Sequence, residues 1–325
     1  MKFKLRLVAL ALTLTFASLI PGLAMAQAYP VKPVRVIVPF APGGPSDIIA
    51  RITAQKLSEA MGQSFVVENR AGAGGTIGTD AVAKSAADGY TVLVSNLPFA
   101  ITPSLYSKIP YNATRDFIPV TLIASGPMLL VTHPSVPVTN LKELLARLKA
   151  QPGAFSYGSA GSGSSAHMAT EYFSMLTGVK MAHIPYKGGG PAMTDLLGGQ
   201  FQLMIESMPL LVPHVKQGKV RAIAITGPKR SASLPDVPTF DELGLHGYDV
   251  SVWTGMWVPA GTPKDIVARL QQEVAKAIAS PDIKERLAEL GTEGVGDSPE
   301  QFAVFVQAEI AKWGKVVRDT GMKVE

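Results

Sequence analysis

Apolar and polar positions follow two different rhythms along this chain. Short runs rich in Val, Ile and Phe, without strict alternation, are typical of strands that are buried on both faces of a parallel sheet. Between these runs, apolar residues recur every three or four positions, which indicates helices. The predicted strands cover 34–40, 65–68, 91–95, 155–158, 182–186, 201–206 and 220–226, and the predicted helices cover 48–61, 77–85, 141–150, 166–177 and 192–197. This alternation predicts a layered α/β fold with right-handed crossovers.

The pattern changes towards the end of the chain, which is nearly all helical from Thr262 onwards. Thr262 resembles an N-cap with Pro263 as the first helical residue, and Ser298 opens a final helix. Such helices need a sheet to cover, so we expect the chain to return near 248–259 to the domain in which it began.

A first crossing falls near 121–134, and two crossings between two α/β lobes predict a hinged, flytrap-like clamp. The expected lobes are 27–125 plus 252–325, which form a discontinuous first lobe, and 126–251, which form the second. Ligands of such a fold bind between the lobes, at the carboxyl ends of the strands.

The first 26 residues have the composition of a secretory signal peptide. Lys2, Lys4 and Arg6 precede an apolar run at 8–20, and a small-x-small cleavage site ends at Ala26. A membrane anchor is the alternative, but all three signal regions occur in order and no longer apolar run follows. We therefore expect export by the Sec route, cleavage near Ala26 and a periplasmic protein.

The charge of the remaining 299 residues (325 minus 26) is small. Three of the net +5 charges belong to the signal peptide, which leaves about +2 and no basis for nucleic-acid binding. The chain has no cysteine, so an exported protein of this length must be stabilised by its cores and not by disulfides. We expect a monomer with two domains.

Four glycine-rich turns, at 42–44, 68–76, 158–165 and 187–191, each join a predicted strand to a predicted helix. Glycine allows the main chain to approach a bound group closely, and the first N–H groups of a helix lack intrahelical partners. A small anion such as a carboxylate suits that place. Any one of these loops could be only a tight turn, but four of them, two in each lobe, favour a site. Hydroxyl donors are added by Thr76, Ser159, Ser162, Ser164 and Ser165.

Enzyme motifs fit these loops poorly. No serine has glycine at both offsets of G-x-S-x-G, and the G-x-G-x-x-A match at 161–166 lacks an acid at the end of the next strand. The five histidines are scattered without metal-ligand spacing. We expect no catalytic residue, no metal and no cofactor. An exported hydrolase that uses the serine-rich turn at 158–165, which we call the serine loop, with His167 as its base, is the enzyme alternative.

Several segments together resemble a known family. They read VPFAPGG at 38–44, VENRAGAGGTIG at 67–78, YGSAGSGSSAHM at 157–168, PYKGGGPAMTDLLGGQ at 185–200 and PAGTP at 259–263. Their content and order are similar to the Bug (TctC-type) family, the periplasmic solute-binding components of tripartite tricarboxylate transporters. The likeness covers essentially the whole mature chain.

The resemblance implies a two-lobed, type II periplasmic binding protein without catalysis. Its ligand would be a small organic carboxylate, and its partners would be the membrane subunits of a tripartite tricarboxylate-type transporter. A periplasmic sensor for a receptor kinase would use the same cleft, and the sequence does not separate the two outputs. The identity of the carboxylate also stays open.

In this family, main-chain N–H groups, hydroxyls and ordered waters from facing loops hold the ligand carboxylate. Asp47 would be either a first-turn helix acid or a group that positions water or a ligand donor, and Glu206 stands near a position where members often carry Asp. Arg70 would pair with a second carboxylate, or else with Glu68 or Asp80. Asn96, Phe99, Met208 and Trp253 occupy stretches that could line the distal end of the ligand. The candidate ligand-binding residues are Phe40, Pro42, Gly43, Gly44, Asp47, Gly74, Thr76, Asn96, Ser159, Ala160, Gly161, Ser162, Gly163, Ser164, His167 and Glu206.

Overall fold

The computed structural model describes residues 29–320. The expected signal peptide at 1–26 lies outside the described residues, so it stays a prediction. Residues from Lys32 onwards form one compact unit, and the fold described below belongs to that unit. Across residues 29–320, no helix has both the length and the apolar character that a membrane crossing requires.

The first part of the sheet is parallel. Strand β1 (Val34–Val38) pairs with β2 (Phe65–Asn69) on one side and with β3 (Thr91–Asn96) on the other. Each strand leads into a helix: α2 (Pro45–Met61), α3 (Thr76–Ala83, after the short 3-10 turn η2 at Ala73–Gly75) and α4 (Pro98–Leu105). Every residue of β3 is buried, as a strand covered on both faces requires.

The second part of the sheet repeats this plan. Strand β5 (Ser156–Ser159) pairs in parallel with β6 (Ala182–Pro185) and with β7 (Leu203–Ser207). Its helices are α5 (Leu141–Ala150), α6 (Ser165–Thr177), α7 (Gly189–Leu197) and α8 (Met208–Lys216). All seven predicted strands and five predicted helices are present, with ends that differ by no more than three residues.

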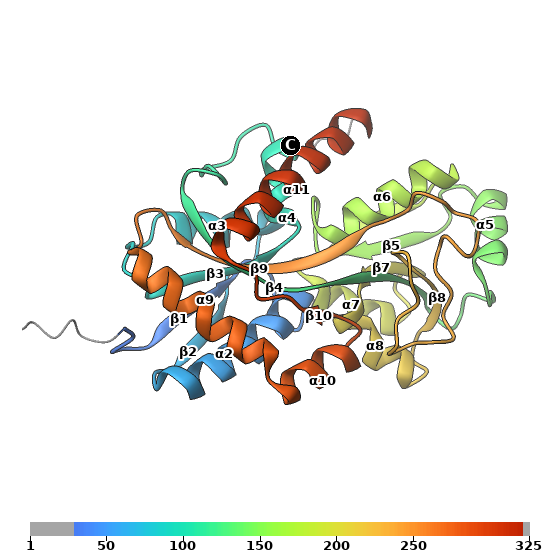
Figure 1. Cartoon of the computed structure of the whole chain (residues 1–325). Helices are drawn as coiled ribbons and strands as arrows, with labels where there is room; N and C mark the ends of the chain where they lie inside the picture. Colours follow the sequence, from blue (N-terminus) through green and yellow to red (C-terminus); the bar gives the residue numbers. More distant parts are fainter. Residues whose placement is uncertain (1–28, 321–325) are drawn as a thin grey trace, which may run out of the picture. The chain divides into compact units, whose positions relative to one another are not determined.

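Two long antiparallel strands, β4 (Phe117–Thr132) and β9 (Ser251–Pro259), connect the two parts. The first two thirds of β4 pair with β9, and its end, from Met128, pairs with β7 and β8 (Arg221–Ile225). Figure 1 shows β4 and β9 running side by side through the middle of the fold. The expected crossings near 121–134 and 248–259 therefore lie on strands that the sequence pattern did not reveal. The lobe boundaries at 125/126 and 251/252 stay a prediction.

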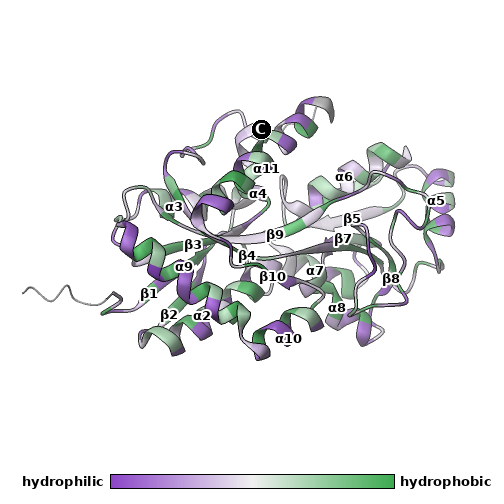
Figure 2. Cartoon of the chain, viewed as in Figure 1, coloured by the Kyte–Doolittle hydropathy of each residue, from purple (hydrophilic) through white to green (hydrophobic). Residues whose placement is uncertain are grey.

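The last part of the chain is helical, as expected, and covers the first part of the sheet. Helix α9 (Lys264–Ala279) packs on α2, α10 (Pro281–Glu289) follows, and α11 (Pro299–Thr320) packs on α4 and β4 after the short strand β10 (Glu293–Gly294). Figure 2 shows hydrophilic and hydrophobic residues alternating around α9. The predicted start of α9 was wrong by one residue. Pro263 is the N-cap, and the Thr262 hydroxyl donates to the oxygen of Pro259 at 2.8 Å.

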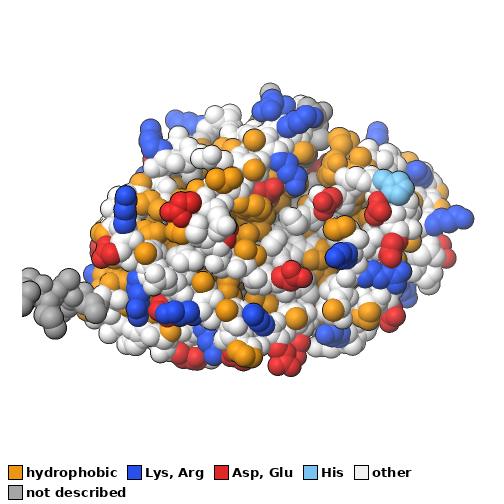
Figure 3. Space-filling model, viewed as in Figure 1, with side chains coloured by type: hydrophobic (Ala, Val, Ile, Leu, Met, Phe, Trp, Pro, Cys, Tyr) orange, Lys and Arg blue, Asp and Glu red, His pale blue; other side chains and the backbone are white. Residues whose placement is uncertain are grey.

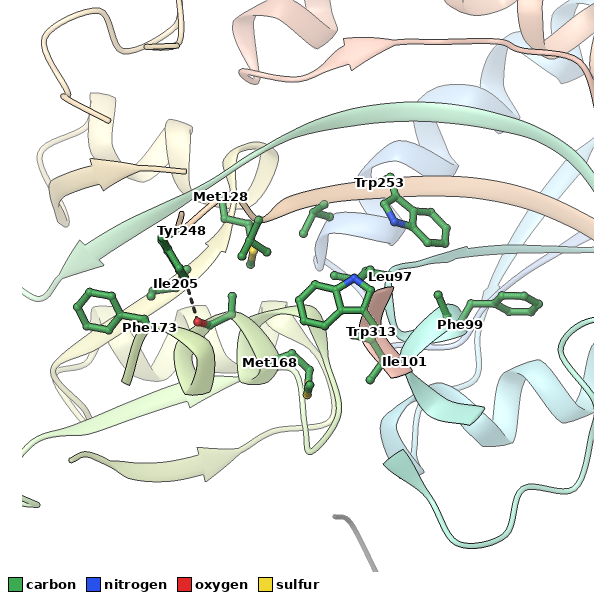
Figure 4. Packing of buried hydrophobic residues seen from close by; sticks show 14 of the residues in the cluster. Leu97, Phe99, Ile101, Met128, Met168, Phe173, Ile205, Tyr248, Trp253 and Trp313 are labelled. Atoms are coloured by element: carbon green, nitrogen blue, oxygen red, sulfur yellow. Dashed lines mark hydrogen bonds between the residues drawn. The ribbon is translucent and has the colours of Figure 1, made fainter. Parts of the chain in front are cut away.

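Aromatic side chains fill the core beneath α11, some of which are drawn in Figure 4. The ring of Phe99 stacks on that of Trp257 with 4.4 Å between centroids, and the indole of Trp253 donates to Glu309 Oε2 at 2.9 Å. Phe99, Met208 and Trp253 are at most 2% exposed. The structure therefore places these three residues in the core, and the suggestion that they line the distal end of a ligand receives no support.

Candidate functional site

The four glycine-rich turns stand where the sequence predicted them, each at the start of a helix. Gly44, Gly75, Ser164 and Gly188 are the N-caps of α2, α3, α6 and α7. Turns from different parts of the sheet meet each other. The N–H of Ala41 donates to the oxygen of Lys187 at 3.1 Å.

The contact between the turns at 42–44 and 187–191 requires glycine at position 190. A Cβ atom on Gly190 would lie 2.3 Å from the main-chain oxygen of Pro42, closer than real Cβ atoms approach. The turns at 42–44 and 187–191 therefore touch main chain to main chain, which no larger residue at Gly190 would allow.

Beside this contact lies a small space that we call the inner cavity. Its volume is about 10 Å³, roughly the room that one water molecule needs. The residues that line it are Phe40, Pro45, Ser46, Asn96, Pro98, Ala160, Ser164, Ser165, Gly189 and Glu206.

Five helices begin at or next to the inner cavity. Pro45, Pro98, Ser165 and Gly189 are the first residues of α2, α4, α6 and α7, and Glu206 precedes the N-cap of α8. These helices have 8 to 17 residues. Helix N-termini carry partial positive charge and unpaired N–H groups, so their convergence favours an anion.

Three polar side chains of the inner cavity lack a hydrogen-bond partner among the described residues. They are Ser46 (Oγ), Asn96 (Oδ1) and Ser165 (Oγ), whose residues are 1%, 6% and 2% exposed. A buried polar atom without a partner is costly, and most such atoms in proteins are paired. These three groups therefore have hydrogen-bonding capacity beside the cavity that the described residues do not use.

Glu206 is the titratable side chain of the inner cavity, and its exposed fraction is 2%. Its Oε1 accepts the N–H of Ser207 at 2.7 Å, and its Oε2 lies 3.4 Å from the place that a Cβ of Gly189 would take. Burial raises the pKa of Glu206 to about 7, against the smaller opposing effect of the Ser207 hydrogen bond. The carboxyl group therefore changes protonation state near neutral pH.

A larger space, which we call the outer cavity, adjoins the inner one through Phe40 and Ala160. Its volume is about 250 Å³. Tyr106 donates its hydroxyl to the oxygen of Ser162 at 3.1 Å beside this space. Lys187 is the one basic residue among the described residues that line either cavity. The complete lining is Phe40, Gly72, Ala73, Gly74, Gly75, Tyr106, Ala160, Gly161, Ser162, Tyr186 and Lys187.

Half of the candidate residues from the sequence gather around the two cavities. The inner cavity includes Phe40, Asn96, Ala160, Ser164 and Glu206, and the outer cavity includes Phe40, Gly74, Ala160, Gly161 and Ser162. The other candidates line neither space: Pro42, Gly43, Gly44, Asp47, Thr76, Ser159, Gly163 and His167.

Asp47 lies outside the cavities and supports the first turn from within. Its Oδ2 accepts the N–H of Gly43 and the Nε of Arg51, both at 2.9 Å, and its Oδ1 accepts from Asn69 at 2.9 Å. Burial raises the pKa of this carboxyl, but these hydrogen bonds and the charge of Arg51 outweigh burial and lower it overall. Because the Gly43 N–H is bonded to Asp47, it is not directed at the cavity.

Ser159 and two half-buried histidines, His167 and His183, support the serine loop in the same way. The hydroxyl of Ser159 lies 2.6 Å from His183 Nε2, and the N–H of Gly163 donates to His167 Nδ1 at 3.1 Å. The two imidazole rings stack at 4.2 Å, and burial is the main cause that lowers the pKa of each.

His167 therefore touches the serine loop, as expected, but it is not aimed at a serine hydroxyl as a base. Its Nδ1 holds a main-chain N–H, and Ser164 Oγ accepts the main-chain N–H of His167 at 3.3 Å. Ser159, which does face an imidazole, is fully buried. This geometry gives the hydrolase alternative no support.

Several residues that line the inner cavity were not among the candidate ligand-binding residues, namely Pro45, Ser46, Pro98, Ser165 and Gly189. Ser165 and Gly189 lie in the predicted glycine-rich turns at 158–165 and 187–191. Ser46 could have been identified from its position at the start of the helix that follows Gly44. Helix α4 was not predicted at all, since it contains prolines at two of its eight positions. Arg70 pairs with Glu68 at 3.2 Å, one of the expected alternatives.

Similar proteins agree with this picture of the fold. The sequence profile of the family described as "Tripartite tricarboxylate transporter family receptor" matches residues 49–322. Protein BugT of Bordetella pertussis is 43% identical over 302 residues, which cover 92% of this chain and 93% of that protein.

Two solved structures are also similar. The periplasmic binding protein BugD has a TM-score of 0.89 and 38% identity, over 91% of this chain and 100% of that one. The R. palustris protein Rpa4515 with adipate has a TM-score of 0.88 and 38% identity, over 91% and 99% of the two chains. These likenesses confirm the expected fold class, a two-lobed α/β periplasmic-binding-protein fold with two crossover segments.

Proposed function

This chain belongs to the tripartite tricarboxylate transporter receptor family, and from that premise we propose that it captures a small organic carboxylate between its two lobes. It then delivers the carboxylate to a membrane transporter of the tripartite tricarboxylate type. Main-chain N–H groups and hydroxyls of the inner cavity hold the anion, and the protein acts as a periplasmic monomer without catalysis. The adipate in the similar structure of Rpa4515 supports a carboxylate as the ligand class.

The observation that carries this proposal is the convergence of helix starts on unpaired polar groups. Five helices begin at or next to the inner cavity, and Ser46, Asn96 and Ser165, which line it, each carry a buried side-chain atom without a partner among the described residues. A carboxylate has two oxygens that accept several hydrogen bonds and a charge that the helix ends stabilise.

Capture requires the loops to part and close again, because the inner cavity has room for about one water molecule. A ligand that contacts both sides stabilises the closed arrangement in proportion to its differential affinity. The bonds from Ala41 to Lys187 and from Tyr106 to Ser162 would then form around the bound ligand.

Calorimetric titration with a panel of organic acids tests the proposal. We expect at least one acid to bind with a Kd of roughly micromolar or tighter, about −8 kcal/mol. Asn96→Ala and Ser165→Ala should each weaken binding by about tenfold, because each removes a hydrogen bond worth roughly 1–1.5 kcal/mol. Ser174→Ala, further along α6 and outside both cavities, is the matched control and should bind like the wild type. Absence of heat and of any melting shift with every acid would contradict the proposal.

Recovery of partners from membranes tests the delivery step. Transporter subunits should be captured by the protein in the presence of its acid and much less in its absence. Capture of a receptor kinase instead would assign the site to sensing.

Figure 3 shows acidic and basic side chains interspersed on the drawn face, an arrangement without the one-sided basic patch of a nucleic-acid-binding surface.

A further inference from the structure

Glu206 has a carboxyl group inside a cavity whose helix N-termini favour anions. The other polar residues that line the inner cavity, Ser46, Asn96, Ser164 and Ser165, are neutral. One carboxyl oxygen of Glu206 is bonded to the N–H of Ser207, and the other lies beside the first residue of α7. The ligand of the proposed function and this side chain therefore carry the same kind of group.

The small size of the inner cavity places the ligand carboxylate and the carboxyl group of Glu206 in contact. Ser46, Asn96 and Ser165, whose polar atoms lack partners among the described residues, line the same space as Glu206, and that space holds about one water molecule. A ligand carboxylate bonded to these atoms must lie directly against the Glu206 carboxyl. Two buried carboxylates in contact cannot both be ionised, and they share one proton instead.

No described cation compensates a second negative charge at this place. The elements that pack on β7 and on the cavity carry titratable groups, but these are engaged elsewhere. Asp47 is paired with Arg51, Glu171 accepts from Tyr157, Asp195 accepts from Tyr186, and His167 accepts from Gly163. His214 and Lys216 lie in the last turn of α8, and β4 has no titratable residue. Lys187 borders the outer cavity only.

We propose that Glu206 enters the bound state as a neutral carboxylic acid that donates a hydrogen bond to the ligand carboxylate, so that ligand capture is coupled to the uptake of one proton. This inference rests on the proposed function, because it names the partner of that carboxylate. In the ligand-free protein the helix N-termini act on Glu206 itself. When a ligand anion takes that place, its charge disfavours an ionised Glu206 and the pKa of Glu206 rises further.

The same arrangement sets the substrate class. A neutral Glu206 matches a carboxylate or hydroxyl oxygen of the ligand, which accepts its proton in a hydrogen bond. A ligand with an ammonium group at this contact would be held more strongly by the ionised form of Glu206 and would bind more tightly as pH rises. The site therefore selects organic acids without an amino group next to the bound carboxylate.

Titration calorimetry with adipate at about pH 6 and at about pH 8.5, in buffers of different ionisation heat, tests the coupling. Because burial puts the pKa of ligand-free Glu206 at about 7, the wild-type Kd should weaken by roughly tenfold per pH unit above that value. Proton uptake should approach one per ligand at the higher pH.

Three variants sharpen this test. Glu206→Gln keeps a neutral hydrogen-bonding group, so it should bind adipate with a Kd that does not change with pH. Glu206→Asp keeps a carboxyl group and should keep the pH dependence. Glu273→Gln changes another buried glutamate, on α9 and outside both cavities, and should behave like the wild type.

A wild-type Kd that is equal at both pH values, or a Glu206→Gln variant with the same pH slope as the wild type, would overturn the inference. Binding that strengthens as pH rises would also overturn it and point to a cationic ligand group. If no acid binds at any pH, the proposed function fails, and infrared difference spectra between wild type and Glu206→Gln decide the state of Glu206. A carboxylic-acid carbonyl band at about pH 6 that disappears by about pH 8.5 supports the proton-carrying role, and its absence at about pH 6 overturns that role.

Discussion

The hydroxyl of Tyr106 donates a hydrogen bond to the main-chain oxygen of Ser162, 56 positions further along the chain, at 3.1 Å. Tyr106 follows α4 in the predicted first lobe, and Ser162 lies in the serine loop of the predicted second lobe. In the proposed function, this bond joins two loops that separate when a ligand enters or leaves.

Removing this bond should weaken ligand capture without weakening the fold. Tyr106→Phe keeps the ring and loses one hydrogen bond worth about 1 kcal/mol, so the affinity for the bound acid should fall by roughly fivefold. Tyr172→Phe is the matched control, because Tyr172 also donates to a main-chain oxygen, that of Gly247, but within one predicted lobe. Titration calorimetry measures both, and an equal loss of affinity in the two variants would contradict a latch at Tyr106.

Asp47 should matter for stability and for the shape of the first turn. Its hydrogen bonds with Gly43, Arg51 and Asn69 are lost or weakened in Asp47→Asn, so the free energy of unfolding at about pH 7 should fall by roughly 1–3 kcal/mol.

The pH dependence of that loss has a definite sign. The pKa of Asp47 is lowered in the folded protein, so its contribution is present above the unfolded pKa of roughly 3.9 and is lost as pH falls through the lower, folded value. Urea unfolding should therefore show wild type and variant converging below about pH 4. Asp282→Asn, which breaks the surface pair with Lys56, should change stability much less. A gap between wild type and Asp47→Asn that is unchanged at low pH would contradict this account.

The sequence predicted the elements whose signals are local and missed those that depend on distant partners. The parallel strands and the glycine-rich turns each produce a local signal, a short run of characteristic residues, and they appear where expected. The antiparallel pairing of β4 with β9 joins segments more than a hundred positions apart, and no local period encodes it. The same limit applies to the site. Asn96 and Glu206 were identified as candidates, but Ser46 was not, because its exposure to the cavity depends on how α2 meets α7.

His183 should make the protein sensitive to acid. Burial is the main cause that lowers its pKa to about 4, and the neighbouring His167 adds to the effect. A histidine with a lowered pKa binds its proton more readily in the unfolded chain, so stability falls as pH drops from about 6.5 towards 4. The loss should be on the order of 1–2 kcal/mol, since the side chain is partly exposed. His183→Gln, which keeps a group that can bond to Ser159, should lose less stability over this range in urea unfolding. An equal loss in both proteins would assign the acid sensitivity to other groups.

Gly190 gives the sharpest test of closure, because an added methyl group should separate binding from folding. Its Cβ would lie 2.3 Å from the oxygen of Pro42 when the two turns touch, yet Gly190 has φ in the ordinary range and is the second residue of α7, where alanine is tolerated at least as well as glycine. Gly190→Ala should therefore fold with nearly unchanged stability but bind its acid at least about tenfold more weakly, because the closed contact costs more than 1.4 kcal/mol. Small-angle scattering should show a larger radius of gyration than the wild type at saturating ligand.

Gly198→Ala provides the matched control at the other end of the same helix. A Cβ there would meet no heavy atom closer than 3.6 Å, and the residue is not in the left-handed region. This variant should bind and compact like the wild type. If Gly190→Ala also bound with wild-type affinity, the contact between the turns at 42–44 and 187–191 would not be part of the ligand-bound state. Capture would then have to occur with the two turns apart, held by the helix N-termini of only one side of the cavity.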